Sequence, residues 1–141
     1  MTPESSAQTK LGLIILASEK FEKLKNFYLT VFGADITVDV PVYCEMQFGP
    51  IRLGIYDACA YLSNLGSAQC VGFNDPSTLN PVELYFYPAN IANTEVAILE
   101  HGGQCLAPIE CKPWGDAVAY YRDPDGNVIA LASPNEDFKV G

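Results

Sequence analysis

Few side chains in this 141-residue sequence can carry chemistry, and Glu83 is the most informative of them. It opens the segment VELYFY, in which Tyr85 and Tyr87 follow at alternate positions. Alternate residues of a strand share one face, so these three side chains are predicted to lie together. A buried carboxylate without a partner takes up a proton or destabilises the fold, so Glu83 needs a partner. Arg52 or a tyrosine hydroxyl is the expected structural partner, and the alternative is a carboxylate that receives a cationic ligand group or acts as a general base.

The histidine and the cysteines do not predict a metal site. His101 is the only histidine, which excludes a histidine-rich metal site, and it precedes Gly102-Gly103 where a helix is expected to end. The five cysteines are odd in number and contain no CxxC pair, so no zinc module is expected. Reduced thiols in a cytoplasmic protein explain them best.

Composition narrows the classes of partner. Eight Lys and Arg against 17 Asp and Glu give a net charge of -9, which disfavours a nucleic-acid partner. No apolar run is long enough for a membrane helix, and the polar start MTPESSAQTK lacks a signal-peptide core. We therefore expect a cytoplasmic protein with neither a membrane nor a nucleic-acid partner.

Hydrophobic periodicity predicts two similar series of elements, each a strand, a helix and three further strands. In the first series Phe21, Leu24, Phe27 and Tyr28 mark the buried side of a helix, with Ser18 as the expected N-cap and Gly33 as the C-cap. The predicted strands of the first series are 11–17, 34–40, 42–49 and 51–57, and the second series has strands 82–87, 104–110, 117–121 and 128–132 with a helix over 91–100.

The two series have the same spacing. Leu13 to Gly33 and Glu83 to Gly103 both span 20 positions, so the unit repeats with an offset of 70 residues. The expected organisation is one domain with a disordered arm over 1–10, a first unit over 11–56, a second over 81–133 and a polar tail over 134–141. Residues 57–80 are expected to form a connecting loop or lid with one short helix near 59–64.

This pattern resembles the glyoxalase / bleomycin-resistance / extradiol-dioxygenase superfamily, also called the vicinal oxygen chelate fold. The likeness rests on the order and spacing of FYLTVFG (27–33), ELYFY (83–87), Gly102-Gly103, Trp114-Gly115 and YRDPDGNVIALAS (121–133). It implies an α+β fold in which two βαβββ repeats form a half-open mixed β-barrel, with helices on the convex side and a concave groove inside. It also implies a homodimer.

The enzymes of this superfamily bind a divalent metal in the groove through His, Gln or Glu. The matching positions here are Leu13, Glu83, Gly54 (or Leu53 in a shifted register) and Ala130. Only Glu83 among them can donate to a metal, and one carboxylate does not make a tight site. We therefore expect no metal and no other cofactor.

A groove rich in aromatic and small residues suits a flat, aromatic or cationic small molecule. Gly54 and Ala130 are expected to leave its centre open. The predicted ligand-binding residues are Leu13, Arg52, Tyr56, Glu83, Tyr85, Tyr87, Trp114 and Tyr120, with Glu83 the only catalytic candidate.

Three functions remain open on the sequence. The favoured one is binding of a small organic molecule in the groove without a metal, for sequestration or sensing. The second is a glyoxalase-like lyase/isomerase or dioxygenase-type enzyme that uses Glu83 or an unrecognised metal site. The third is a homodimeric interaction module whose groove is filled by its own 57–80 segment.

Overall fold

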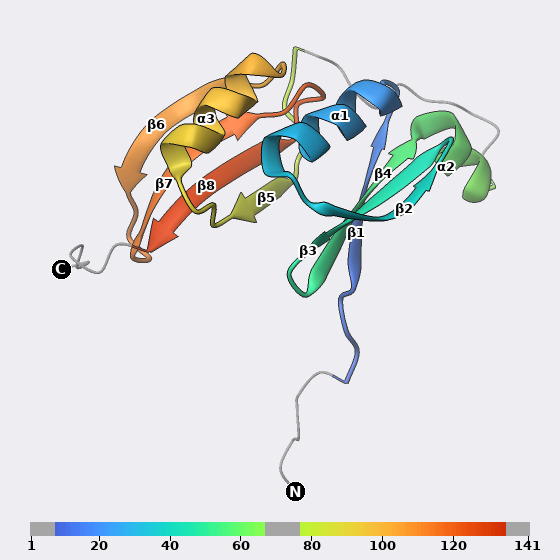
Figure 1. Ribbon diagram of the computed structural model, residues 1–141, viewed down its shortest axis with the longest axis horizontal. Helices are drawn as coiled ribbons and strands as arrows, with labels where there is room; N and C mark the ends of the chain where they lie inside the picture. The colour runs from blue at the N-terminus through green and yellow to red at the C-terminus, as the bar shows by residue number, and fades with distance from the viewer. Residues whose placement is uncertain (1–7, 67–76, 135–141) are drawn as a thin grey trace, which may run out of the picture.

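The computed structural model describes residues 8–66 and 77–134, which fold into two βαβββ units joined through α2 (Figure 1). The first unit comprises β1 (Leu13–Ser18), α1 (Phe21–Phe32), β2 (Asp35–Val40), β3 (Tyr43–Phe48) and β4 (Ile51–Asp57), and α2 (Ala58–Asn64) follows it. The second unit comprises β5 (Glu83–Phe86), α3 (Ile91–Glu100), β6 (Gln104–Cys111), β7 (Asp116–Arg122) and β8 (Val128–Pro134). The predicted α+β class is confirmed.

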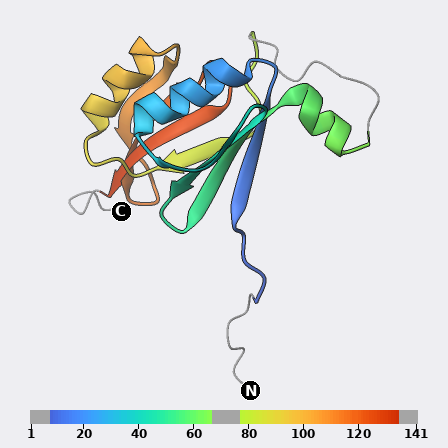
Figure 2. The ribbon, with the colours of Figure 1, turned by 45° about the vertical axis from the view of Figure 1, so that its right-hand side comes forward.

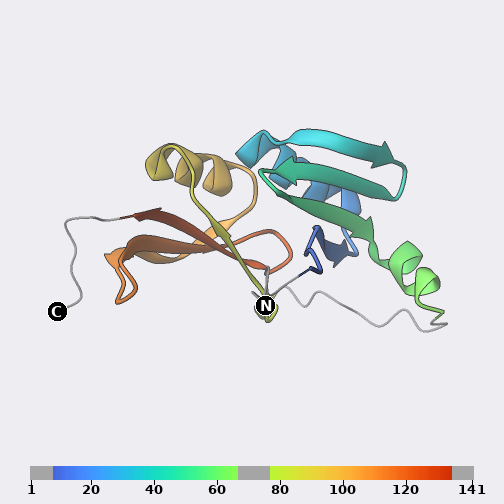
Figure 3. The same cartoon turned by 90° about the horizontal axis from the view of Figure 1, so that it is seen from below.

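Each unit forms its own four-stranded mixed sheet, in the order β1-β4-β3-β2 and β5-β8-β7-β6. In both sheets the first strand pairs in parallel with the last strand of its unit, and the other pairs are antiparallel. Both β1 and β5, and both α1 and α3, start 70 residues apart, which confirms the predicted repeat. The two sheets are not closed on one another and stay separate in the view from below (Figure 3).

The α1 helix follows the predicted pattern, because its apolar residues Phe21, Leu24, Phe27 and Tyr28 are the buried ones. Gly33 ends the helix with a left-handed φ of 63°, a conformation that glycine adopts at little cost. The expected N-cap is wrong. Ser18 is the last residue of β1, and its Oγ accepts the Lys20 N–H at 2.9 Å before the helix begins.

One hydrophobic core joins the two units. The helices α1 and α3 lie side by side above the sheets (Figure 1), and the core-facing residues of both sheets pack beneath them. Leu16 and Ile55 of the first sheet and Ile129 and Leu131 of the second belong to this single cluster. Since both sheets turn one face to this core, their other faces are left for ligands or partners.

The predicted short helix in the 57–80 connection is confirmed as α2, which extends beyond the first sheet (Figure 2). The Asp57 carboxylate caps it by accepting the Ala60 N–H at 3.1 Å. Residues 67–76 of that connection lie outside the described residues, as do 1–7 of the predicted arm and 135–141 of the tail. Among the described helices, none is both long and apolar enough to cross a membrane.

Candidate functional site

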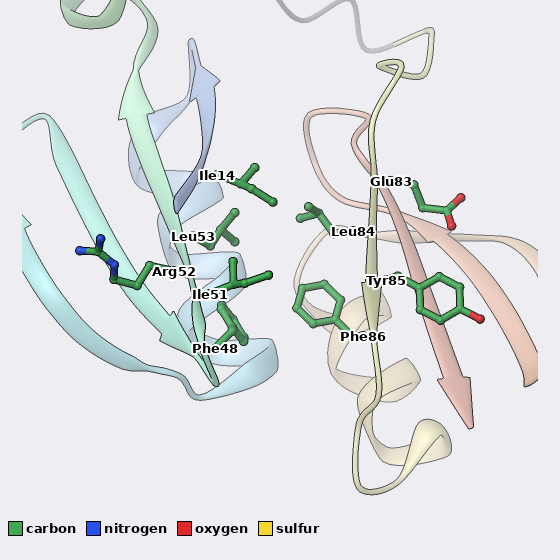
Figure 4. Close-up of a pocket in the computed structure, with 9 residues that line it drawn as sticks. All are labelled: Ile14, Phe48, Ile51, Arg52, Leu53, Glu83, Leu84, Tyr85 and Phe86. Carbon is green, nitrogen blue, oxygen red and sulfur yellow. The ribbon is translucent and has the colours of Figure 1, made fainter. Parts of the chain in front are cut away.

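The sheet faces that turn away from the core point to opposite sides of the chain. Figure 4 shows Ile14 and Leu53 of the first sheet facing Leu84 and Phe86 of the second, whereas Arg52 points away from them on one side. Glu83 and Tyr85 point away on the other side. We call these outward surfaces the first face, on β1, β4 and β3, and the second face, on β5, β8 and β7.

The predicted ligand-binding residues are therefore divided between two faces, and only Arg52, Glu83 and Tyr85 among them line one cleft together. Leu13, Arg52 and Tyr56 lie on the first face, whereas Glu83, Tyr85, Tyr87, Trp114 and Tyr120 lie on the second face or its rim. The alternation of each strand was predicted correctly, but the side chains expected to share one groove point to opposite sides of the chain. The shared core between the sheets is the reason, because it holds the two outward faces apart.

Glu45 organises the first face. Its carboxylate is 5% exposed and accepts bonds from the Tyr43 hydroxyl at 2.7 Å, Thr37 Oγ1 at 3.0 Å and Arg52 Nη1 at 2.6 Å. The hydrogen bond from Tyr43 is the main cause that holds the pKa of Glu45 below its usual value. Glu45 is therefore a fixed anion that positions Arg52, and it is poorly suited to act as a general base.

This arrangement replaces the ion pair expected between Glu83 and Arg52. Arg52 bridges to Glu45 on the neighbouring strand, while Glu83 is exposed on the far side of the molecule. Because Glu83 lies in solvent, it has no need of the buried partner that the sequence argument demanded.

Asp116 organises the second face. Its Oδ2 accepts the Tyr85 hydroxyl at 2.6 Å and the Tyr87 hydroxyl at 3.0 Å, and Trp114 Nε1 donates to the Tyr85 oxygen at 2.9 Å. Desolvation and the bond to Asp116 raise the pKa of Tyr85 to about 12, so its hydroxyl stays protonated and keeps donating. We call Tyr85, Tyr87, Trp114 and Asp116 the Asp116 cluster.

Lys112 and Tyr120 also lie on the second face, beside this cluster. Lys112 Nζ lies 5.4 Å from the centre of the Tyr120 ring and forms an ion pair with Glu110 at 2.8 Å. Tyr120 and Tyr85 pack on a floor of small buried residues, Val118, Ala130 and Ala132. The ammonium group and the ring show that this face already holds one cation against an aromatic surface.

The open centre expected at Gly54 and Ala130 is wrong, because tyrosines of the same chain fill both places. A Cβ at Gly54 would lie 2.6 Å from the Tyr43 hydroxyl oxygen and 2.8 Å from its Cε1. On the second face, Ala130 is fully buried beneath Tyr85 and Tyr120. The small residues make room for aromatic rings of the protein itself.

Gly54→Ala is expected to lower the free energy of unfolding by about 1–3 kcal/mol, because the new methyl group displaces the Tyr43 ring from its bond to Glu45. Urea unfolding measures this loss. Gly12→Ala is the matched control, since a Cβ there meets only Arg52 Nη2 at 3.7 Å. In a Tyr43→Ala background the Gly54→Ala loss should largely disappear, and an undiminished loss there would refute the explanation.

A cleft of about 280 Å³ opens between the two sheets rather than on either outward face. It is lined mostly by the apolar side chains that face one another in Figure 4, namely Ile14, Phe48, Ile51, Leu53, Leu84 and Phe86. Its lining also includes Arg52, Glu83 and Tyr85. Phe86 stacks on Phe32 with ring centres 4.2 Å apart, so the cleft continues directly into the core. It offers few polar groups that could orient a ligand.

The residues at the superfamily's metal positions do not fit a metal. Leu13, Gly54 and Ala130 have no side-chain donor, so Glu83 is the only one of the four that could bind a metal. Within residues 8–66 and 77–134, no three His, Cys, Asp or Glu side chains are grouped so that they could hold an ion.

Sequence reasoning missed the two carboxylates that organise the faces, Glu45 and Asp116. A usable signal was present, because alternation in YCEMQF separates Tyr43, Glu45 and Gln47 from the buried Cys44 and Met46. The predicted site took residues from the first and last strands of each unit and Tyr120 from β7, but none from β3.

Comparisons with known proteins agree with this architecture. The family model described as a glyoxalase-like domain matches residues 11–136. No curated protein matches the sequence. Among solved structures, a glyoxalase-related enzyme from Fulvimarina pelagi has a TM-score of 0.73 at 22% identity, with 88% of this chain and 87% of that chain covered.

Two further solved structures share the fold. A glyoxalase/bleomycin resistance protein/dioxygenase from Nocardioides gives a TM-score of 0.73 at 18% identity over 96% of this chain and 89% of that one. A bleomycin resistance determinant encoded on the transposon Tn5 gives 0.59 at 21% identity, over 91% of this chain and 99% of that one. With its paired βαβββ units and a family match over nearly its whole length, the chain belongs to the glyoxalase-like domain family.

Proposed function

We propose that this protein binds a small organic molecule without a metal, for sequestration or sensing, and that a homodimer completes its binding site. In this arrangement the first face of one protomer lies opposite the second face of its partner. The observation that supports the proposal is the opposite orientation of Arg52 and Tyr85 in one chain, which would make each face half of a site.

A single face is too open to enclose a ligand. Small-molecule sites usually bury most of the surface of their ligand, yet Tyr87 and Trp114 are 61% and 59% exposed in the single chain. A two-fold axis presents the same pair of surfaces twice, so one dimer would hold two equivalent sites. The fixed Glu45 and Asp116 networks would then form opposite walls of each site.

The hydrogen bonds on the two faces support ligand binding rather than catalysis. Glu45 is engaged by three donors, and the hydroxyls of Tyr85 and Tyr87 are both committed to Asp116. Prearranged polar groups of this kind orient a ligand at little cost in entropy. Glu83, the only catalytic candidate, is exposed to solvent in the single chain.

Sedimentation and ligand screening test the proposal together. A chain of 15.3 kDa is expected to sediment as a dimer. Titration with a panel of aromatic and cationic small molecules should then change the fluorescence of Trp114, the only tryptophan. Binding should weaken in parallel with dimer dissociation on dilution. A monomer at all concentrations, or equal affinity in monomer and dimer, would contradict the shared site.

A further inference from the structure

The Asp116 cluster has the features of a site for an organic cation. Tyr85 of β5 and Tyr87 just after it both donate to the Asp116 carboxylate, and Trp114 from the turn before β7 donates to the Tyr85 hydroxyl oxygen. The rings of Tyr85 and Tyr87 are 5.5 Å apart at an interplanar angle of 63°, so they present surfaces in two directions. The hydrogen bonds hold these rings in place, and no side chain has to be ordered when a ligand arrives.

The hydrogen bonds also make the rings better partners for a cation. A phenol that donates to a carboxylate gains electron density in its ring, and a cation is attracted to the negative face of such a ring. Both Tyr85 and Tyr87 donate to Asp116 Oδ2. Trp114 and Tyr87 keep more than half of their surface exposed, so a ligand can reach them.

The charge next to the cluster favours a cationic ligand. Asp116 supplies a carboxylate, and the ion pair between Lys112 and Glu110 is neutral overall. Farther along the second face, Glu83 and Arg122 lie in one row on either side of Val128 and have opposite charges. The whole chain has a net charge of -9, which attracts cations over a longer range and repels anions. One carboxylate surrounded by rings suits a large, weakly hydrated cation better than a metal ion, which needs several oxygen ligands.

We propose that the Asp116 cluster recognises an ammonium group that carries alkyl or aromatic substituents. This inference rests on the proposed small-molecule function and names the class of ligand for the second face. The alkyl groups would contact the rings of Tyr87 and Trp114, and the charge would lie towards Asp116. Beside the cluster, the Lys112 ammonium group already pairs with Glu110 and contacts the Tyr120 ring, in the way proposed for the ligand.

Three probes of similar shape and different charge test the inference. The dimeric protein is titrated with tetramethylammonium, tert-butanol and pivalate, and the indole N–H signal of Trp114 is followed by NMR. This signal is unique because the sequence has one tryptophan. Tetramethylammonium is expected to shift the signal saturably and to bind at least about tenfold more tightly than either other probe.

Amino-acid substitutions test whether tetramethylammonium binds at the Asp116 cluster. Asp116→Asn is expected to weaken tetramethylammonium binding about tenfold, and Tyr87→Leu, which removes an exposed ring, by several-fold. Asp35→Asn removes the same charge from β2 of the other sheet and should leave the affinity unchanged. Equal binding of all three probes, or an unchanged affinity in Asp116→Asn, would overturn the inference.

The outcomes also separate this inference from the proposed function. If tetramethylammonium leaves Trp114 unmoved while another small molecule binds the dimer, the assignment of a cation is wrong and the proposed function stands. If the protein is monomeric and no compound of the panel binds, both the proposed function and the inference built on it are refuted.

Discussion

Asp123→Ala is expected to lower the free energy of unfolding by about 3–5 kcal/mol, the largest loss among the substitutions considered. The Asp123 carboxylate is fully buried in the turn between β7 and β8. It accepts the Tyr28 hydroxyl at 2.6 Å, the N–H groups of Asp125 and Asn127 at 2.9 Å each, and Asn127 Nδ2 at 2.8 Å. Alanine would leave all four buried donors without their acceptor.

This turn also ties the two units together, because Tyr28 lies on α1 of the first unit. Urea unfolding measures the effect. Tyr28→Phe removes one of the four bonds and should cost about 1–2 kcal/mol. The control for the loss of charge is Asp35→Asn, which removes an exposed carboxylate from β2 and should change stability little. A loss below about 1 kcal/mol in Asp123→Ala would show that the network contributes little to joining the units.

Gly103→Ala is expected to lower the free energy of unfolding by about 3 kcal/mol. A Cβ at this position would overlap Ile98 Cγ2 and lie 2.8 Å from the backbone oxygen of Arg122. Ile98 is fully buried in the core and the Arg122 oxygen belongs to β7, so neither can move aside cheaply. The end of α3 must therefore shift away from the second sheet.

Thermal unfolding of Gly103→Ala beside Gly12→Ala checks this expectation. The control adds the same methyl group where its nearest neighbour is the end of a long side chain. A melting temperature that falls no further in Gly103→Ala than in Gly12→Ala would contradict this explanation, because the glycine-to-alanine change in the unfolded chain by itself favours the folded state.

Local pattern predicted the elements well because each has a strong periodic signal. The apolar spacing of Phe21, Leu24, Phe27 and Tyr28 fixes one face of α1, and Gly33 ends it. Tyr120, a predicted ligand-binding residue, lies on the outward side of β7, next to Tyr121, which is 1% exposed on the core side. The 70-residue repeat followed from the same local constraints applied twice.

The relation between the units could not be predicted from such patterns. Alternation says which residues share a face of one sheet, but the direction in which two sheets face depends on how α1 and α3 pack together. Gly54 illustrates the same limit. A small residue on a sheet face can leave an opening or accommodate a neighbouring ring, and only the position of Tyr43 decides between them.

The most direct test of the shared site is an isotope-filtered NOE experiment on a mixed dimer of labelled and unlabelled chains. In one chain Trp114 bonds to Tyr85 of the second face, and Ile15 and Tyr56 share the first face with Arg52 by strand alternation. Arg52 and Tyr85 point to opposite sides in Figure 4. The account predicts intermolecular NOEs from the Trp114 indole of one protomer to Ile15 or Tyr56 of its partner. A dimer in which these NOEs are absent, and intermolecular NOEs connect other surfaces such as α3, would contradict the proposal that two copies complete the site.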